Sequence, residues 1–269
     1  MSATARIDAV RTRLIIQALA LALACGLAAC APVAGRIRFD IPPDCQIDPN
    51  GPVSIPVAPT RQQLECVLSG IREVIIPTPE QDLLAARAAG ELAAGDSDVN
   101  RIEKLASEGQ WFAERALFHH QNDPTALYWM SVNLGQLMIR HPIKALRNLS
   151  KMESALKKAA KAVPDVDEGG PLRVLGMLYV KAPSWPQGIG DSDKGIDLLR
   201  KAVQIHPEHP LNHFFLARAM WDVDGDSVKD EVAASLSAAS TALAAREWGW
   251  ASRRWERDLA ALMREAKLP

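Results

Sequence analysis

Apolar residues recur at helical spacing through most of the chain, and short polar or proline-containing breaks separate the segments. The first segment covers residues 61–75, where Pro77 and Pro79 end it. Asn122-Asp123-Pro124 marks another break, because proline suits the first turn of the following helix. Further helices are expected at about 80–94, 98–121, 125–140, 143–163, 171–181, 192–206, 210–222, 228–246 and 249–266. No alternating apolar run of strand length occurs, so we predict an all-α fold.

Small residues recur along the chain at a nearly constant period. One set is spaced by 43 residues, Ala116, Ala159 and Ala202. A second set is spaced by 41 residues, Leu134-Gly135, Leu175-Gly176 and Leu216-Ala217. A period near forty residues with two helices per unit is typical of stacked helical hairpins. We therefore predict a tetratricopeptide-like α-solenoid, which presents binding surfaces, and we expect no enzyme activity.

The first 29 residues match a bacterial lipoprotein signal. An arginine-containing start precedes the apolar stretch 14–27, which is shorter than the roughly 20 residues that span a bilayer. Leu27-Ala28-Ala29-Cys30 resembles the cleavage motif of lipoproteins, and Cys25 is a weaker competing site. Lipidation of Cys30 would anchor the mature chain in the periplasm, and Ala31, by resemblance to lipoprotein sorting, favours the outer membrane. The alternatives are an ordinary secretory signal or a membrane-anchoring helix.

Residues 30–60 are predicted to form a tether, because their seven prolines exclude a helix and favour an extended spacer. The helical domain then covers residues 61–269. Cys45 and Cys66 remain in the mature chain, and the oxidising compartment implied by the signal favours a disulfide between them. The alternative is two unpaired cysteines, with Cys66 buried on a helix face.

The net charge of the chain argues against nucleic acid as a partner, and the spacing of its possible metal ligands argues against a bound metal ion. The formal net charge is −1, and removal of residues 1–29, with three arginines and one aspartate, leaves −3. A mildly acidic chain without a stripe dense in Lys and Arg gives no electrostatic basis for binding nucleic acid. The histidines lack a ligand set at standard spacing, and residues 222–226 resemble a calcium loop only at its start, so no metal or cofactor is expected.

Residues 126–224 contain a set of motifs that resembles one family. The motifs are Ala126-Leu127-Tyr128-Trp129, Asn133-Leu134-Gly135, Asp167-Glu168-Gly169-Gly170-Pro171-Leu172-Arg173-Val174-Leu175-Gly176 and Gly190-Asp191. Together they resemble the T component of TRAP transporters, the TatT family. The resemblance implies a periplasmic lipoprotein of tetratricopeptide-like helices that assists uptake of small organic solutes, either carboxylates or hydrophobic molecules. It also implies a solute-binding protein of a TRAP transporter as partner, and a homotrimer with a central pore.

The proline-rich, cysteine-containing N-terminus and the tryptophan-rich segment 248–255 depart from that family. The alternative function is a general tetratricopeptide-like scaffold for protein–protein interactions in envelope assembly. Trp248 and Trp255 are seven residues apart and share a helical stripe, which fits either a capping helix over the last repeat or an interface with a partner.

Six residues are candidates for ligand binding, Tyr128, Trp129, Asn133, Arg173, Tyr179 and Trp185. All but Trp185 fall on the first helices of consecutive repeats, which line the concave surface of such arrays. Arg173 could hold a carboxylate through two parallel hydrogen bonds. The alternative is that the aromatic residues form ordinary core and that Arg173 caps carbonyls or pairs with Asp167 or Glu168. Trp185 is either a lid or partner contact, or part of a loop packed onto the array.

Overall fold

We describe residues 54–138 and 141–268 of a computed structural model, with only the backbone of residues 142–145. The chain divides into two units, Met1–Ile37 and Arg38–Pro269, and the described residues belong to the second. The predicted signal peptide with Cys30, Cys45 and most of the predicted tether lie outside the described residues. Within the described ranges, no helix combines the length and hydrophobicity that crossing a membrane requires.

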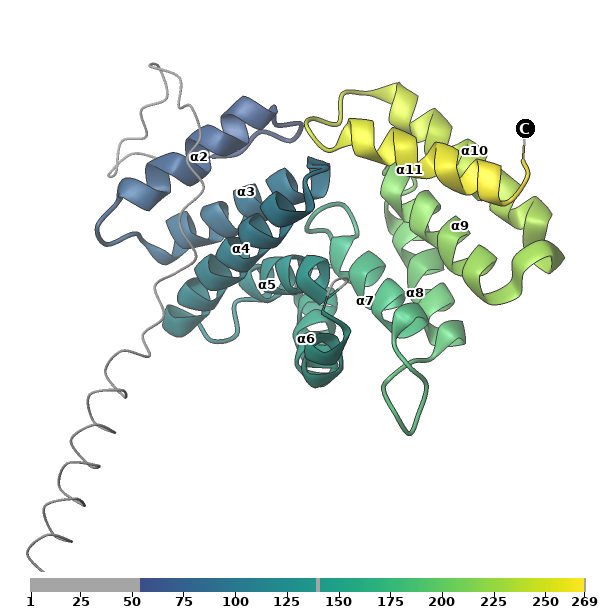
Figure 1. Ribbon diagram of the computed structural model, residues 1–269, viewed down its shortest axis with the longest axis horizontal. Helices are drawn as coiled ribbons and strands as arrows, with labels where there is room; N and C mark the ends of the chain where they lie inside the picture. The colour runs from purple at the N-terminus through teal and green to yellow at the C-terminus, as the bar shows by residue number, and fades with distance from the viewer. Residues whose placement is uncertain (1–53, 139–140, 269) are drawn as a thin grey trace, which may run out of the picture. The chain divides into compact units, whose positions relative to one another are not determined.

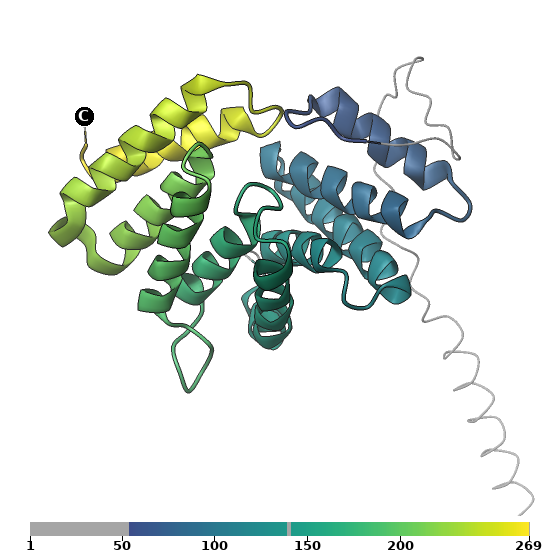
Figure 2. The same ribbon diagram turned by 180° about the vertical axis from the view of Figure 1, so that it is seen from behind.

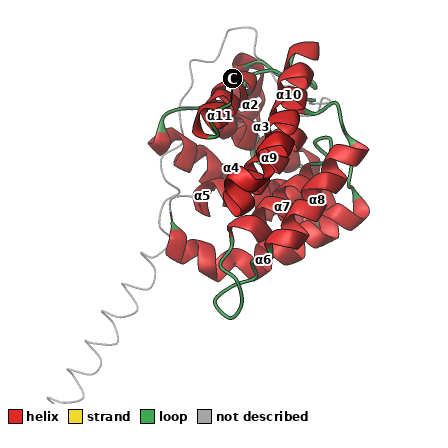
Figure 3. Ribbon diagram, turned by 90° about the vertical axis from the view of Figure 1, so that its right-hand side faces the viewer, coloured by secondary structure: helices red, strands yellow, loops and turns green. Residues whose placement is uncertain are grey.

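The described chain is helical, and Figure 3 shows only helices and connecting loops. The helices are α2 (Arg61–Glu73), α3 (Pro79–Gly95), α4 (Val99–His119), α5 (Pro124–Met138), α6 (Pro142–Ala162), α7 (Gly170–Lys181), α8 (Ser192–Ile205), α9 (Pro210–Asp224), the short 3₁₀ helix η1 (Gly225–Val228), α10 (Lys229–Ala245) and α11 (Ser252–Glu265). The all-α prediction is confirmed. Residues 222–226, which resembled a calcium loop, form the end of α9 and the start of η1.

Prolines and threonines set several helix starts. Pro79 and Pro210 occupy the first positions of α3 and α9, where a missing backbone N–H costs nothing. The side chains of Thr60 and Thr78 each accept a hydrogen bond from the backbone N–H of the glutamine three residues later, and the glutamine side-chain oxygen accepts one from the threonine N–H. These reciprocal capping boxes satisfy amide groups that a helix start leaves unpaired. The local sequence therefore fixes where α2 and α3 begin.

Successive helices pack as hairpins in two layers, as Figure 1 shows. Helix α3 packs on α4, α5 on α6, α7 on α8 and α9 on α10. The first helices of these hairpins also contact one another in sequence, α3 with α5, α5 with α7 and α7 with α9. Across the described residues, α4, α6, α8 and α10 make no such contacts with one another. This arrangement is the predicted helical-hairpin array, with α3, α5, α7 and α9 as its inner layer.

The alanines of the 43-residue period occupy equivalent positions. Ala116, Ala159 and Ala202 are at most 3% exposed and lie in the last turns of α4, α6 and α8. In each case the backbone N–H that follows the helix donates to the carbonyl of that alanine. The small residues therefore mark matching ends of the second helix in consecutive hairpins, which explains their spacing.

Glycines allow close helix crossings at two places in the array. A Cβ on Gly176 of α7 would overlap the backbone of Gly195 in α8, so this hairpin depends on the absence of a side chain. A Cβ on Gly109 of α4 would overlap the amide of Asn133, which is fully buried on α5. Asn133 donates to the carbonyls of Ala86 at 3.0 Å and Trp129 at 2.8 Å, which ties α5 to α3.

Substituting Gly109 by alanine is expected to destabilise the protein, and the same change at Gly135 is not. A Gly135 Cβ would meet only the flexible end of Met152 at 3.3 Å, whereas a Gly109 Cβ would displace the held amide of Asn133. Alanine raises helix propensity by about 1 kcal/mol at both positions. We expect Gly109→Ala to lose about 1–3 kcal/mol in urea unfolding, and Gly135→Ala to be neutral or stabilising. Equal effects would contradict this packing.

The C-terminal helix returns to the start of the array, as Figures 1 and 2 show from opposite sides. The backbone N–H of Trp250 donates to Pro59 O at 2.8 Å, and its ring N–H donates to Leu92 O at 3.2 Å. Arg254 of α11 donates to Asp96 O at 2.9 Å beyond α3. The last helix therefore joins the first hairpin and closes the inner layer on itself.

The first helix begins at Arg61, where the helical domain was predicted to begin, and the end of the predicted tether lies against it. Residues 55–60, predicted as tether, pack against the domain: Ile55 is buried, and Pro56 O accepts from Arg87 at 3.2 Å. Cys66 is disulfide-bonded. Because Cys45 lies outside the described residues, the pairing of these two cysteines stays a prediction.

Candidate functional site

The inner layer surrounds a cavity of about 830 Å³. Its lining comes from α3, α5, α7, α9 and α11, from the turn before α7 and from the loop before α11. Among the second helices of the hairpins, only the first turns of α4 contribute, through Val99 and Ile102. A cavity of this size falls in the range of small-molecule sites. The prediction that the first helices of the repeats line a common hollow is confirmed.

Aromatic side chains form much of the cavity wall. They are Tyr128, Trp129, Phe214, Phe215, Trp248, Trp250 and Trp255. The rings of Trp248 and Trp255 lie 6.0 Å apart, and His209 stacks edge-on to Trp248 at 4.9 Å. The tryptophan rings therefore line the cavity, and α11 also packs on α9 and α10 through Leu259 and Leu262, as expected of a helix that covers the last hairpin. The alternative of an interface with a partner stays a prediction.

Arg173 lines this cavity but its guanidinium is committed to internal acceptors. The side chain is 3% exposed. It donates to Asp167 Oδ2 at 2.6 Å and to Asn212 Oδ1 at 2.7 Å, and it also contacts the carbonyls of Asp167 and Glu168. The idea that Arg173 holds a ligand carboxylate is therefore corrected: it caps carbonyls and pairs with Asp167, the alternative that the sequence left open.

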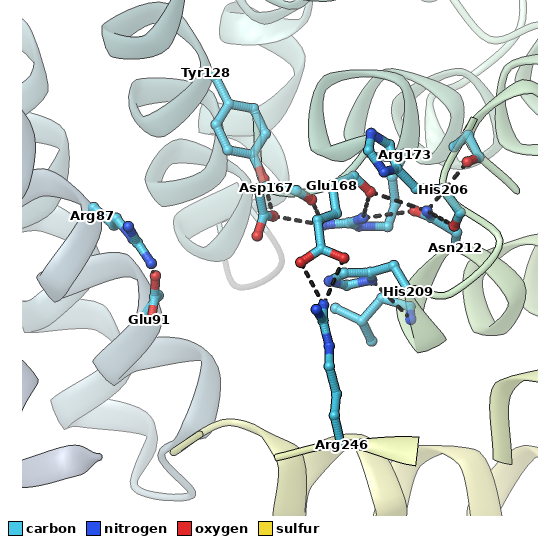
Figure 4. Close-up of polar contacts among 12 residues, drawn as sticks. Arg87, Glu91, Tyr128, Asp167, Glu168, Arg173, His206, His209, Asn212 and Arg246 are labelled. Atoms are coloured by element: carbon cyan, nitrogen blue, oxygen red, sulfur yellow. Dashed lines mark hydrogen bonds and ion pairs between the residues drawn. The ribbon is translucent and has the colours of Figure 1, made fainter. Parts of the chain in front are cut away.

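The turn before α7 has an unusual backbone, and Arg173 holds it in place. Asp167, Glu168 and Gly169 have φ values of 51°, 48° and 90°. Left-handed φ costs an ordinary residue on the order of 1–2 kcal/mol, so two consecutive examples need strong support. Arg173 contacts both carbonyls, and Asn212 Nδ2 donates to Glu168 O at 3.0 Å. The result is that the carboxylates of Asp167 and Glu168 are held at the cavity wall (Figure 4).

Each of these two carboxylates has a defined partner. The hydroxyl of Tyr128 donates to Asp167 Oδ2. Burial and the nearby Asp167 raise the pKa of Tyr128 well above its usual value, so the phenol stays protonated. Glu168 accepts from Nη2 of Arg246 at 2.6 Å, and the Arg246 guanidinium lies 3.8 Å from the centre of the Trp248 ring. These contacts join the turn to the end of α10.

His209 closes one side of this network as a neutral residue. Its Nδ1 accepts from the Leu211 N–H at 3.3 Å and caps α9. Burial, followed by the positive charges of Arg173 and Arg246, lowers the pKa of His209 to about 2. The side chain therefore stays uncharged at physiological pH and serves as part of the aromatic wall. Across the described chain, no group of three or more side chains could hold a metal ion.

Glu91 lies across the cavity from the turn, on α3 (Figure 4). Arg87, one helical turn earlier, donates to its Oε1 at 2.6 Å. Desolvation raises the pKa of Glu91 to about 7, against the lowering effect of Arg87, and the negative charge of Asp167 adds to the rise. The Glu91 side chain is 22% exposed, so it is not fully enclosed by the protein. A perturbed carboxyl group in an aromatic cavity marks a candidate binding group.

Three of the six predicted site residues do not line the cavity. Asn133 is buried between helices, as described above. Tyr179 is also buried, where its hydroxyl donates to Glu153 at 2.6 Å and Lys194 lies 4.2 Å from its ring centre. Trp185 is 85% exposed on the loop between α7 and α8, away from the cavity and not packed onto the array. Only Tyr128, Trp129 and Arg173 are brought together.

The sequence did not identify several residues that the fold places at or around the cavity. They are Glu91, His209, Asn212, Trp250 and Arg246. Glu91 and Arg87 look like an ordinary helical ion pair four residues apart, and nothing local distinguishes them from the Arg61–Glu65 pair of α2. The tryptophan-rich segment 248–255 stands out in the sequence, but the direction in which its side chains point depends on how α11 packs against the first hairpin.

The chain was also compared with known proteins. No protein-family model matches the chain, and no curated protein matches it. The assignment to a family therefore rests on the motifs within residues 126–224 and is part of the proposal below.

Proposed function

We propose that this protein is a lipid-anchored periplasmic component that binds a small organic solute in its central cavity, as an accessory to TRAP-type uptake. The observation that carries the proposal is the aromatic-walled cavity of about 830 Å³, which is open to solvent on one side. Aromatic and aliphatic walls with a few oriented polar groups are typical of small-molecule sites. The lipoprotein motif at Cys30 and the TatT-like segment 167–176 support the anchor and the transport role.

The cavity has the organisation that solute binding requires. Its apolar walls provide favourable burial of a ligand body, which contributes roughly 25 cal/mol for each Å² removed from water. Its polar groups are held by internal contacts before any ligand arrives, since Arg173 and Asn212 fix the turn at residues 167–169. Such preorganisation reduces the ordering cost of binding. The residues that line the cavity are therefore suited to reversible binding of a small solute.

Native mass spectrometry of the mature protein from its own host tests this function. We expect the mass of a chain that begins at an acylated Cys30, together with a small molecule released on denaturation. A trimer would agree with the family resemblance. A chain without acylation would contradict the lipid anchor, and a chain without any bound molecule after gentle purification would contradict the solute-binding role.

A cavity-filling variant makes the test specific to this site. Ala261 lies on α11, lines the cavity and is exposed, so Ala261→Trp places a large ring there without disturbing the core. We expect this variant to lose the bound molecule while it keeps wild-type helicity. Ala234→Trp on the exposed face of α10 is the matched control and should retain the molecule. Retention by both variants would place the ligand elsewhere.

The alternative of a protein-interaction scaffold has one observation in its favour. Phe118 and Trp185 are 80% and 85% exposed, on α4 and on the α7–α8 loop. Large exposed aromatic side chains are enriched at interfaces. Both lie outside the cavity lining, so a scaffold would use different residues from a solute-binding protein. Loss of a partner in Trp185→Ala, with the bound molecule unchanged, would favour this role.

A further inference from the structure

The inference concerns the ligand class and rests on the proposed solute-binding function. We propose that the cavity recognises a protonated amine, whose ammonium group lies between Glu91 on α3 and Asp167 in the turn before α7. The ammonium group would donate to carboxylate oxygens, and the remainder of the ligand would contact the aromatic wall. The sequence had suggested organic carboxylates or hydrophobic molecules instead. Four features of the cavity lead to this choice.

The first feature is a pair of carboxylates that face each other with acceptor capacity to spare. Arg87 donates to Oε1 of Glu91, and no donor in the described chain reaches Oε2. Tyr128 and Arg173 both donate to Oδ2 of Asp167, which leaves Oδ1 without a donor among the described residues. Figure 4 shows the two carboxylates on opposite sides of the open space. An ammonium group has only donors, so it complements both.

The second feature is an unmatched amide oxygen on the same wall as Glu91. Gln136 of α5 lines the cavity, and its Nε2 donates to the carbonyl of Gly90 at 3.0 Å, beside Glu91 in sequence. Its Oε1 is buried and has no hydrogen-bond partner within the described ranges. If the side-chain amide of Gln136 were turned over, its oxygen would face the carbonyl oxygen of Gly90. The Gly90 carbonyl therefore fixes which amide atom is nitrogen and which is oxygen. An unpaired buried acceptor is costly. This oxygen is not itself open to the cavity, but its partial negative charge adds to that of Glu91 beside it.

The third feature is that the inner guanidinium groups already have acceptors. Arg87 pairs with Glu91, Arg173 with Asp167 and Asn212, and Arg254 with Asp96 O. A carboxylate ligand would have to displace an internal partner of Arg173, the most buried of the three, and at Arg87 and Arg254 it would compete with acceptors already bound. Arg257 and Arg264 also line the cavity, but both are exposed, where water screens their charge. Among the lining residues that the structure describes, the buried side-chain atom without a hydrogen-bond partner is an acceptor, Gln136 Oε1.

The fourth feature is the aromatic wall. Trp129 of α5 lines the cavity, and the ring closest to it is Tyr128, at 5.0 Å in an edge-on arrangement. A cation within about 6 Å of a tryptophan face is attracted by the ring electrons. Two other rings at the cavity already interact with protein cations, Trp248 with Arg246 and Trp250 with Arg61. The wall is therefore suited to cations in general.

Binding of an amine at this position should depend on the ionisation of Glu91. The charged or titratable groups that act on it are Arg87 on its own helix, Tyr128 on α5 and Asp167 in the turn before α7, and Arg254 of α11 lines the same cavity. Within the described chain, α2 and α4 add no titratable side chain to the lining. Tyr128 stays protonated near neutral pH because its pKa is raised, whereas Glu91 has a pKa of about 7.

Calorimetry with three matched probes tests the inference. The probes are 2-phenylethylamine, 3-phenylpropanoate and 2-phenylethanol, which share a ring and differ in the polar group. We expect the amine to bind at least tenfold more tightly than the other two at pH 8. Its affinity should fall about tenfold between pH 8 and pH 6, because protonation removes the charge of Glu91 while the amine stays protonated. Glu91→Gln should abolish both the preference and the pH dependence, and Glu231→Gln, on the exposed face of α10, should leave both unchanged.

The outcomes separate this inference from the function on which it rests. Preference for the acid, equal binding of the three probes, or a preference for the amine that persists in Glu91→Gln would overturn the ammonium site. Any of these would leave the solute-binding proposal intact. Absence of binding by all three probes, together with no co-purified molecule in native mass spectrometry, would overturn both. Circular dichroism of each variant confirms that the fold is retained.

Discussion

Replacing Arg173 by methionine is expected to destabilise the protein by about 2–4 kcal/mol, because it removes a buried guanidinium and leaves several acceptors without that donor. Methionine keeps much of the length of the side chain but none of its donors. Asp167 would lose its ion pair, Asn212 Oδ1 its donor, and the left-handed turn at residues 167–169 its support. Urea unfolding followed by circular dichroism measures the change.

The matched control is Arg200→Met on α8. Arg200 is 56% exposed and contacts Asp197 at 3.5 Å within its own helix, so its loss should change stability by no more than about 0.5 kcal/mol. An Arg173→Met protein as stable as the wild type would show that the turn does not depend on this residue. Selective loss of carboxylate binding without loss of stability would restore the original idea that Arg173 holds a ligand.

Glu91→Gln is expected to stabilise the protein, and the gain in unfolding free energy over wild type should be larger at pH 8 than at pH 5 by on the order of 2 kcal/mol. The folded state raises the pKa of Glu91 from 4.5 to about 7. Between these values the folded protein holds a proton that the unfolded chain has released. The contribution of Glu91 to stability is therefore favourable at low pH and is lost as pH rises through 7, where the carboxylate must ionise in a desolvated site. Glutamine stays neutral and avoids this loss.

The comparison uses the difference in unfolding free energy between variant and wild type at each pH, so that shared titrations cancel. The difference should be small at pH 5 and should increase up to pH 8. Glu231→Gln, on the outer surface, should give a small difference that does not vary with pH. A Glu91→Gln difference that decreases with pH would mean that Arg87 dominates and that the carboxylate favours the folded state.

The repeat pattern was sufficient to predict the architecture. Ala116, Ala159 and Ala202 end the second helices of consecutive hairpins because each hairpin repeats the same close crossing. Helix boundaries followed from local chemistry, since prolines such as Pro79 and Pro210 open helices wherever they stand. The fold class and the inner position of the first helices were thus predictable from short-range signals.

The candidate site was only partly predictable. Tyr128 and Trp129 reach the cavity as expected, because their helix belongs to the inner layer. Asn133, one turn further on, points between helices instead, and the sequence offers no means of separating the two directions. Trp185 was chosen because it interrupts a repeat, but its loop extends away from the cavity. Long-range packing decides which side chains meet.

What the chain determines by itself is therefore a series of helical hairpins, set by helical spacing, capping residues and small side chains that act over a few turns. The tertiary structure decides how the series ends: Trp250 donates hydrogen bonds to Pro59 and Leu92, and these contacts bring the last helix to the first hairpin around a common cavity. It also decides that the Arg173 side chain donates to Asp167 and Asn212, while Oε2 of Glu91 accepts from no donor in the described residues. Those outcomes depend on distances between residues far apart in sequence and on the exclusion of water, which no local pattern specifies.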